Sequence, residues 1–177
     1  MAVLFANALT SVTSDLDVLV LYADSTSGGA ADVQAKLRAG LAGRVDTFNL
    51  QTGTPTPAAL AAYDVALVYS YHPIANPTGL GDTLADFVDA GGGVVVSTYG
   101  NYTGSFLVQG RFLTGGYHAL TGTAFSNADP GTFTSRHAYH PVLEGATTTA
   151  CPSLCRHMTG ATLTPGAIEV ASWSSPS

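Results

Sequence analysis

The chain has 177 residues, with 12 acidic and 6 basic side chains and a net charge of −6; a chain of this length can bury the core of one domain. Only 10% of the residues are charged, against about a quarter in ordinary globular domains, and no basic patch is present, which excludes nucleic acid and acidic membranes as partners. No apolar run approaches the roughly 20 residues of a membrane helix, so we expect no membrane insertion.

The first predicted elements alternate between strand and helix. Residues 17–22 (DVLVLY) form a short apolar run that predicts a buried strand. Residues 30–42 place Val33, Leu37 and Leu41 at spacings of four before Gly43, which predicts an amphipathic helix with a glycine stop. Residues 44–50 predict a second strand, and residues 58–62 predict a short helix after a loop with two prolines. Strand, helix and strand in this order indicate a βαβ unit.

Three further elements extend this pattern. Residues 64–70 are apolar on both faces, as expected for the middle of a parallel sheet. Residues 78–90 place apolar side chains at helical spacing and end at three glycines, and residues 94–97 predict a fourth strand. The alternation predicts an α/β fold, a flavodoxin-like three-layer sandwich with a mostly parallel central sheet and helices on both faces.

The pattern is weaker in the last third of the chain. We expect a helix over residues 105–113, loop or short strand over 117–123 and 132–138, and a last strand over 167–173. Residues 1–16 are expected to be an N-terminal extension and residues 17–177 a single domain. Because the chain stops just after an apolar strand, we expect this domain to be truncated at its C-terminus.

Several segments together resemble the class I glutamine amidotransferase-like superfamily, in its ThuA-like branch. They lie in the same order as in that branch, at residues 64–71, 87–96, 109–112, 140–145 and 163–173. The resemblance implies a turn after the fourth strand where glutaminase members carry a catalytic cysteine, completed by a later His–Glu pair. Thr98, or alternatively Ser97, stands at that position here, so glutaminase activity is not expected.

The strand ends supply the candidate ligand-binding residues. Ligands of open parallel sheets bind at the carboxyl ends of the strands, near the point where the strand order reverses. That rule selects seven residues, namely Asp24, Ser25, Tyr71, His72, Thr98, Tyr99 and Asn101. They can bind a carbohydrate by stacking and hydrogen bonding, or they can be structural, with Asp24 and Thr98 capping helices. Thr98 and His72 are also the candidate catalytic residues, because a hydroxyl nucleophile needs a base within reach.

Two other groups of polar residues allow more than one interpretation. Arg111 can hold an anionic group, or it can bond backbone carbonyls and fix a loop; we include it among the candidate ligand-binding residues. The histidines at 72, 118, 137, 140 and 157 can supply a base or metal ligands, but the spacing of His137 and His140 arises easily by chance. We expect no metal, and no cofactor, because the glycine runs match no nucleotide-binding pattern.

Cys151 and Cys155 are the only cysteines. They can form a local disulfide, stay as free thiols, or join His157 in a metal site. We expect the disulfide, which favours an extracellular or cell-surface location.

The sequence therefore predicts a non-catalytic amidotransferase-like binding or structural module of a secreted or surface protein. Other domains of a longer chain, or copies of this one, are its expected partners, and carbohydrate is its candidate ligand. The alternative is a ThuA-like enzyme that acts on carbohydrate at the strand ends. A metal-dependent hydrolase is a weaker third interpretation.

Overall fold

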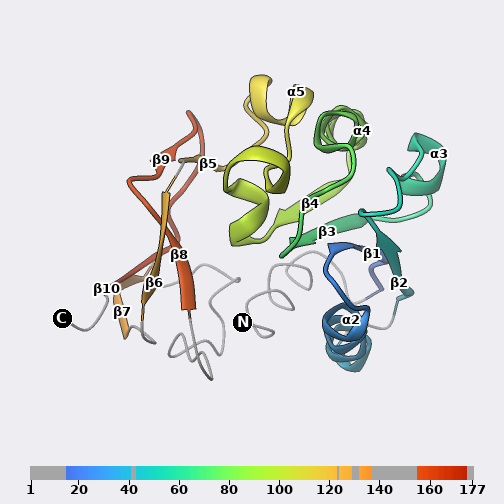
Figure 1. The fold of residues 1–177 in the computed structure, drawn as a ribbon, viewed down its shortest axis with the longest axis horizontal. Helices are drawn as coiled ribbons and strands as arrows, with labels where there is room; N and C mark the ends of the chain where they lie inside the picture. The colour runs from blue at the N-terminus through green and yellow to red at the C-terminus, as the bar shows by residue number, and fades with distance from the viewer. Residues whose placement is uncertain (1–14, 41–42, 123, 129–131, 137–154, 175–177) are drawn as a thin grey trace.

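The computed structural model describes residues 15–40, 43–122, 124–128, 132–136 and 155–174. At its centre is an all-parallel sheet of four strands in the order β2-β1-β3-β4. The strands are β1 (Val18–Ala23), β2 (Val45–Asn49), β3 (Val65–Ser70) and β4 (Gly93–Val96). Figure 1 shows α2 (Gly28–Gly40) on one face of this sheet, and α3 (Pro57–Leu60) and α4 (Pro77–Asp89) on the other. The predicted flavodoxin-like α/β sandwich is confirmed.

Alternate side chains of the central strands feed two separate cores. Leu19 and Leu21 of β1 face α3 and α4, where they pack with Leu80 and Leu84. Val18 and Val20 of the same strand face α2 and pack with Leu37. Because both faces of β1 and β3 are covered, these strands are apolar almost throughout, as the sequence indicates.

Side-chain caps fix where two of the helices begin. Thr56 accepts a hydrogen bond from the backbone N–H of Ala59 at the start of α3. Asn76 accepts one from Gly79 at the start of α4. A proline follows each cap at the first helical position, where its missing N–H costs nothing. Both helices therefore begin one residue earlier than the apolar spacing predicts.

The helix predicted over residues 105–113 is wrong. In its place are two short helices, η2 (Gly104–Phe106) and α5 (Gly110–Thr114). Gly110 has a φ of 58°. This left-handed conformation interrupts a continuous helix, and glycine tolerates it best. The backbone N–H of Gln109 donates to Pro77 at the start of α4. The helical conformation is therefore interrupted between Phe106 and Gly110, and this interruption lets α5 pack against α4.

After α5 the described chain forms three antiparallel strand pairs. They are β5 (Leu120–Thr121) with β9 (Thr162–Leu163), β6 (Ala124–Ala128) with β8 (Cys155–Thr159), and β7 (Thr132–Arg136) with β10 (Ala171–Ser174). Figure 1 shows them on the β4 side of the parallel sheet. The expected last strand exists but begins four residues later than residue 167, while β6 and β8 were not predicted.

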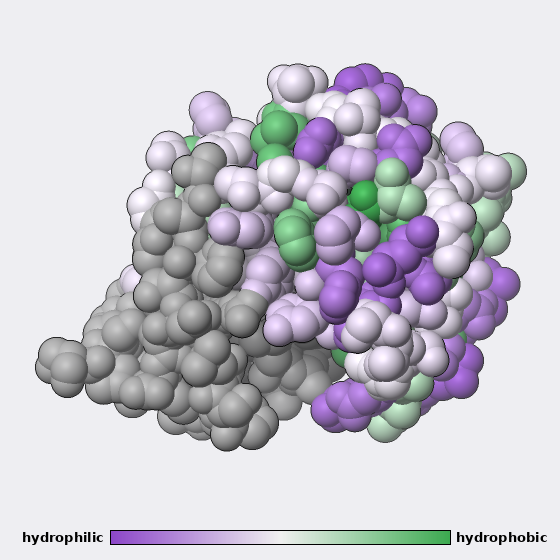
Figure 2. Space-filling model, in the orientation of Figure 1, coloured by the Kyte–Doolittle hydropathy of each residue, from purple (hydrophilic) through white to green (hydrophobic). Residues whose placement is uncertain are grey.

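The surface mixes polar and apolar residues. Figure 2 shows hydrophilic and hydrophobic residues interspersed over the helical part of the molecule. Among the described residues, the large hydrophobic side chains that are exposed are Tyr71, Leu163 and Ile168. No described helix is long and apolar enough to cross a membrane.

Candidate functional site

The strand order places a reversal point between β1 and β3. The chain runs from β1 outward to β2, then crosses back to β3 on the other side of β1. The segments that leave the carboxyl ends of β1 and β3 therefore diverge, which is the geometry that opens a ligand crevice in sheets of this kind. Asp24 follows β1, and Tyr71 and His72 follow β3, so the structure brings these predicted residues to one edge.

Asp24 lies at the base of this edge and is held from two sides. Its Oδ2 accepts a hydrogen bond from the Tyr69 hydroxyl at 3.0 Å, and its Oδ1 accepts one from the backbone N–H of Ser25 at 2.6 Å. Burial, and then the bond to this carboxylate, raise the pKa of Tyr69 to about 12. The Asp24 side chain keeps 15% of its surface exposed. A recessed carboxylate thus faces the edge with its position fixed.

A glycine permits this arrangement. A Cβ atom on Gly29 would lie 3.0 Å from Asp24 Oδ2 and 3.1 Å from the Tyr69 hydroxyl, both tighter than ordinary contacts. The first turn of α2 therefore lies directly against the bonded pair, and the positive end of the helix favours a carboxylate there. From the sequence, Asp24 could be a helix cap. In the structure its side chain bonds Tyr69 of β3 as well as Ser25 in the loop after β1.

His72 and Tyr71 lie beside the carboxylate. The Nε2 atom of His72 is 3.9 Å from Asp24 Oδ1, which is an ion-pair distance when the ring is protonated but too long for a direct hydrogen bond. The Tyr71 ring meets the His72 ring edge to face, with centroids 5.6 Å apart. Tyr71 is 49% exposed, so a large flat side chain stands in solvent next to a recessed acid.

Tyr71 belongs to a larger group of rings that we call the aromatic rim, formed by Tyr71, Tyr99, Tyr102 and Phe106. Tyr99 is central: its centroid lies 5.5 Å from Tyr71, 6.1 Å from Tyr102 and 5.9 Å from Phe106. The pairs with Tyr71 and Tyr102 are edge to face and the pair with Phe106 is tilted; edge-to-face pairs at these separations stabilise one another. The rings come from the segments after β3 and β4, so the rim joins two strand ends. Tyr102 and Phe106 were not predicted as site residues.

The turn after β4 carries Thr98 and Asn101 within η1 (Thr98–Asn101). Asn101 lies beneath the rim rather than on it, because its side chain is buried. Its Nδ2 donates to the Ser97 carbonyl at 3.2 Å, and its Oδ1 is 2.7 Å from Nδ1 of His118. Asn101 thus supports the turn from within, a role for which the sequence offered no signal other than its position.

Arg111 is not among the strand-end residues. It lies in α5, and its guanidinium pairs with Asp86 and Asp89 of α4, each at 2.5 Å. Its backbone N–H donates to Asp82 of the same helix. The guanidinium therefore binds side-chain carboxylates on a neighbouring helix, which differs from both an anion site and the predicted bonds to backbone carbonyls.

The structure describes the side chains of two histidines and of neither cysteine. Of the two histidines whose side chains the structure describes, His72 lies at the strand ends and His118 is buried below them. Among the described residues, no group of three or more His, Cys, Asp or Glu side chains could hold a metal ion. His137, His140 and Cys151 lie outside the described residues, and the side chains of Cys155 and His157 are not described either. The disulfide thus stays a prediction.

A hollow of about 970 Å³ lies at the opposite end of the sheet, by the amino ends of β3 and β4. Its lining is mostly apolar, and its two carboxylates already have partners: Asp64 accepts from the backbone of Asp17, and Asp86 binds Arg111. Specific ligand sites add a few converging polar groups to an apolar lining. The strand-end site offers such groups, and the hollow does not.

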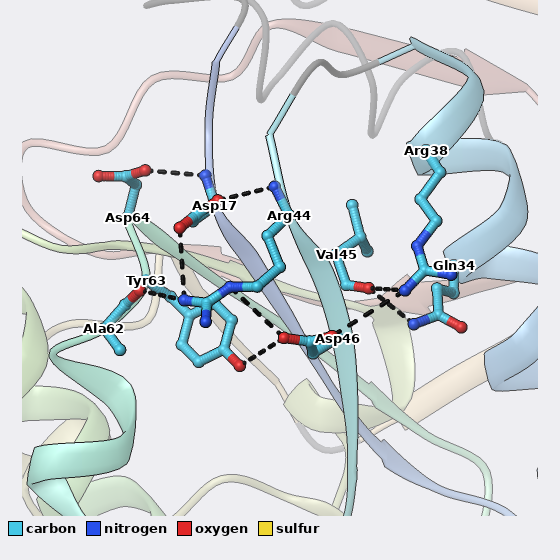
Figure 3. A network of polar contacts seen from close by, with 9 residues as sticks. All are labelled: Asp17, Gln34, Arg38, Arg44, Val45, Asp46, Ala62, Tyr63 and Asp64. Atoms are coloured by element: carbon cyan, nitrogen blue, oxygen red, sulfur yellow. Dashed lines mark hydrogen bonds and ion pairs between the residues drawn. The ribbon is translucent and has the colours of Figure 1, made fainter.

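The network in Figure 3 explains the polar residues near that hollow. Arg44 donates to the Ala62 carbonyl at 2.6 Å and pairs with Asp17 and Asp46. Its guanidinium lies 4.3 Å from the centre of the Tyr63 ring, a favourable cation–π position. These contacts join the segments that lead into β1, β2 and β3, so this network holds the sheet together at its amino edge.

Comparison of the chain with protein-family models, with curated proteins and with solved structures found no match. The amidotransferase-like resemblance therefore stays a prediction, and the candidate site depends on its geometry alone.

Proposed function

We propose that this chain is a non-catalytic, amidotransferase-like binding module of a secreted or cell-surface protein, and that it binds carbohydrate at the carboxyl ends of its parallel strands. The observation that carries the proposal is the exposed Tyr71 ring beside the recessed Asp24 carboxylate. In a larger assembly, other domains or further copies of the chain would be its partners.

The chemistry of the edge suits a neutral sugar. The apolar face of a sugar ring can stack on a tyrosine, while its hydroxyls donate to a carboxylate held nearby. Oδ1 of Asp24 accepts from the backbone N–H and the hydroxyl of Ser25, whereas Oδ2 accepts from Tyr69. A carboxylate oxygen accepts more than one hydrogen bond, so Oδ2 can also accept from a sugar hydroxyl. His72 and Ser25 add polar atoms at the same edge. The site thus combines one flat apolar surface with one fixed acceptor.

The non-catalytic part of this proposal is supported by the contacts of the two histidines whose side chains the structure describes. A threonine hydroxyl is a weak nucleophile without a base in hydrogen-bond contact. His118 is engaged by Asn101 and the Val108 carbonyl, and His72 lies by Asp24, after β3. Both histidines with described side chains thus have partners of their own, and Thr98 stands where the resemblance implies a cysteine nucleophile.

The test is an NMR titration of the ¹⁵N-labelled chain with methyl glycosides of glucose, galactose, mannose and N-acetylglucosamine. We expect at least one of them to shift the backbone amides of residues 24–25, 69–72 and 98–102. Tyr71→Ala should weaken that binding about tenfold, the order of one aromatic contact. The matched control is Ile168→Ala, which removes another exposed apolar side chain and should leave the affinity unchanged. If no glycoside shifts these amides, the proposal is wrong.

The second candidate function is a ThuA-like enzyme that acts on carbohydrate, and the proximity of His72 to Asp24 favours it. A glycoside or sugar derivative would then be turned over by the purified chain. Loss of that turnover in His72→Ala and Thr98→Ala variants that still fold would replace the non-catalytic proposal with this one.

A further inference from the structure

His118 is the one buried histidine among the described residues, with 2% of its surface exposed. Both of its ring nitrogens face oxygen atoms: Nδ1 is 2.7 Å from Asn101 Oδ1, and Nε2 is 2.8 Å from the Val108 carbonyl. A neutral imidazole has one N–H, whereas the imidazolium has two. The described geometry therefore offers two acceptors to a ring that carries two donors only when it is protonated.

Asn101 cannot relieve this mismatch by turning its amide over. Its Nδ2 donates to the Ser97 carbonyl at 3.2 Å, and reversing the amide would put Oδ1 against that carbonyl instead. The neutral ring thus leaves one contact without a proton, either at Val108 or at Asn101. Val108 is tied to the same turn, because its N–H donates to Gly100 at 3.0 Å. Either loss falls on the segment that carries Thr98 and Tyr99.

The surroundings of the ring oppose its charge. The Phe112 ring of α5 meets it edge to face at 4.8 Å, and the bonding partners from η1 and from the segment before α5 are the uncharged Asn101 and Val108. Thr164 contacts only its backbone carbonyl. Burial lowers the pKa of His118, while the bond to Val108 raises it. The neighbouring strand β8 carries Arg156 and His157. On balance the pKa of His118 lies below its usual value, so the second proton joins the ring only as the pH falls.

We infer that His118 is a positioning residue of the strand-end site, and that its second proton completes the bonds to Asn101 and Val108 and so fixes the turn that carries Thr98 and Tyr99. The inference rests on the proposed function in one respect, since it is the regulation of that same site. Tyr99 is the central ring of the aromatic rim. Carbohydrate binding is therefore tighter when His118 is protonated.

The direct test needs no ligand. Imidazole and amide ¹⁵N spectra of the whole chain are recorded between about pH 5 and pH 8, the range in which histidines titrate. We expect the Asn101 side-chain amide and the backbone amides of residues 97–101 to shift with the midpoint of His118. Amides that stay still, or that follow His72 or His157, would overturn the inference.

Two variants sharpen this readout. Asn101→Asp puts a carboxylate against Nδ1, which favours the imidazolium and should move the common midpoint to higher pH. The matched control, His72→Gln, removes the exposed histidine of the same edge and should leave the midpoint unmoved. A midpoint that moves with His72→Gln, or stays fixed in Asn101→Asp, would contradict the assignment.

The binding arm separates the two proposals. The glycoside that binds best should bind about fivefold more tightly at the acidic end of the titration than at the alkaline end, the worth of one hydrogen bond. In His118→Gln, which cannot take up the second proton, this difference should disappear. Co-titration without any glycoside binding would refute only the proposed function. Binding that is equal at both pH values would refute this inference and leave the proposed function intact.

Discussion

A hydrogen bond of 3.0 Å joins the side chain of Tyr69 in β3 to that of Asp24, which follows β1. The bond requires the phenol to keep its proton, and burial adds to that requirement. The pKa of Tyr69 in the folded chain is therefore about 12, above its ordinary value of 10.0. A group whose pKa is raised by folding contributes stability below its unfolded pKa and loses it as the pH rises through the folded one.

This contribution can be observed in alkali. We expect ultraviolet titration of the folded chain to show one tyrosine that ionises near pH 12, and Tyr69→Phe to remove that late step. In urea denaturation, the wild type should lose stability relative to Tyr69→Phe as the pH rises from 10 to 12, because only the unfolded phenol ionises in that window. A variant that instead removes a step near pH 10 would show that Asp24 does not hold the proton.

At this scale the sequence selects residues at the strand ends more readily than the residues that support them. Asp24, Tyr71, His72 and Tyr99 followed from one rule, because polar residues after parallel strands gather at one edge. Tyr69 was not predicted as a site residue, because it lies within an apolar run that indicates a buried strand. His118 and Asn101 are 17 residues apart, and no local pattern links a buried histidine to the amide it bonds.

Between elements, α4 passes very close to the segment leading into α5. A Cβ atom on Gly81 would stand 1.7 Å from the backbone oxygen of Gln109, a distance that no small adjustment accommodates. The crossing therefore requires glycine at this point of α4. This contact also explains why residues 105–113 do not form one helix, since a continuous helix there would not place Gln109 against Gly81.

Two glycine substitutions in helices test this crossing against intrinsic helix preference. Gly81→Ala should destabilise the chain by about 3 kcal/mol, because the added methyl overpacks a fixed backbone contact. Gly40→Ala is the matched control at the end of α2, where the new Cβ meets no described atom within 4 Å; it should stabilise the chain by about 0.5 kcal/mol. Urea denaturation measures both, and equal effects of the two would refute the close approach.

Over the whole molecule, burial is unevenly distributed. Every residue of β1 is buried, and so are all but one of β3. The exposed pair β5 and β9 has two residues in each strand. Backbone hydrogen bonds open most rarely where they are covered by packed side chains on both faces. The parallel sheet is thus the stable part of the described structure.

Hydrogen exchange followed by mass spectrometry measures this difference. We expect peptides that cover β1 and β3 to exchange most slowly and peptides that cover β5 and β9 to exchange fastest, with β4 between them because its valines are half-buried. Protection of β5 and β9 equal to that of β1 would mean that the two regions unfold as one unit.

The same difference explains how much of the fold could be predicted. The parallel strands are continuous apolar runs with helices between them, and each is recognisable from its own residues. The antiparallel pairs are not: Thr121 pairs with Thr162, and Ser126 with His157, so neither the partners nor a strongly alternating pattern lies nearby in sequence. Their strands depend on contacts that only the folded chain supplies.

The strand order also sets the sequence of events during synthesis. β1 leaves the ribosome first, but in space it lies between β2 and β3, so one edge of a fully apolar strand waits without a neighbour until β3 has been made. Asp24 likewise lacks its bonding partner until Tyr69 has been made, and Tyr71 lacks the contact with Tyr99 until the segment after β4 has been made. A chain released within α4 would carry Asp24, Tyr69 and Tyr71 but would lack β4 and the other rings of the aromatic rim. Because β3 would then have an open edge, we expect such a fragment to aggregate.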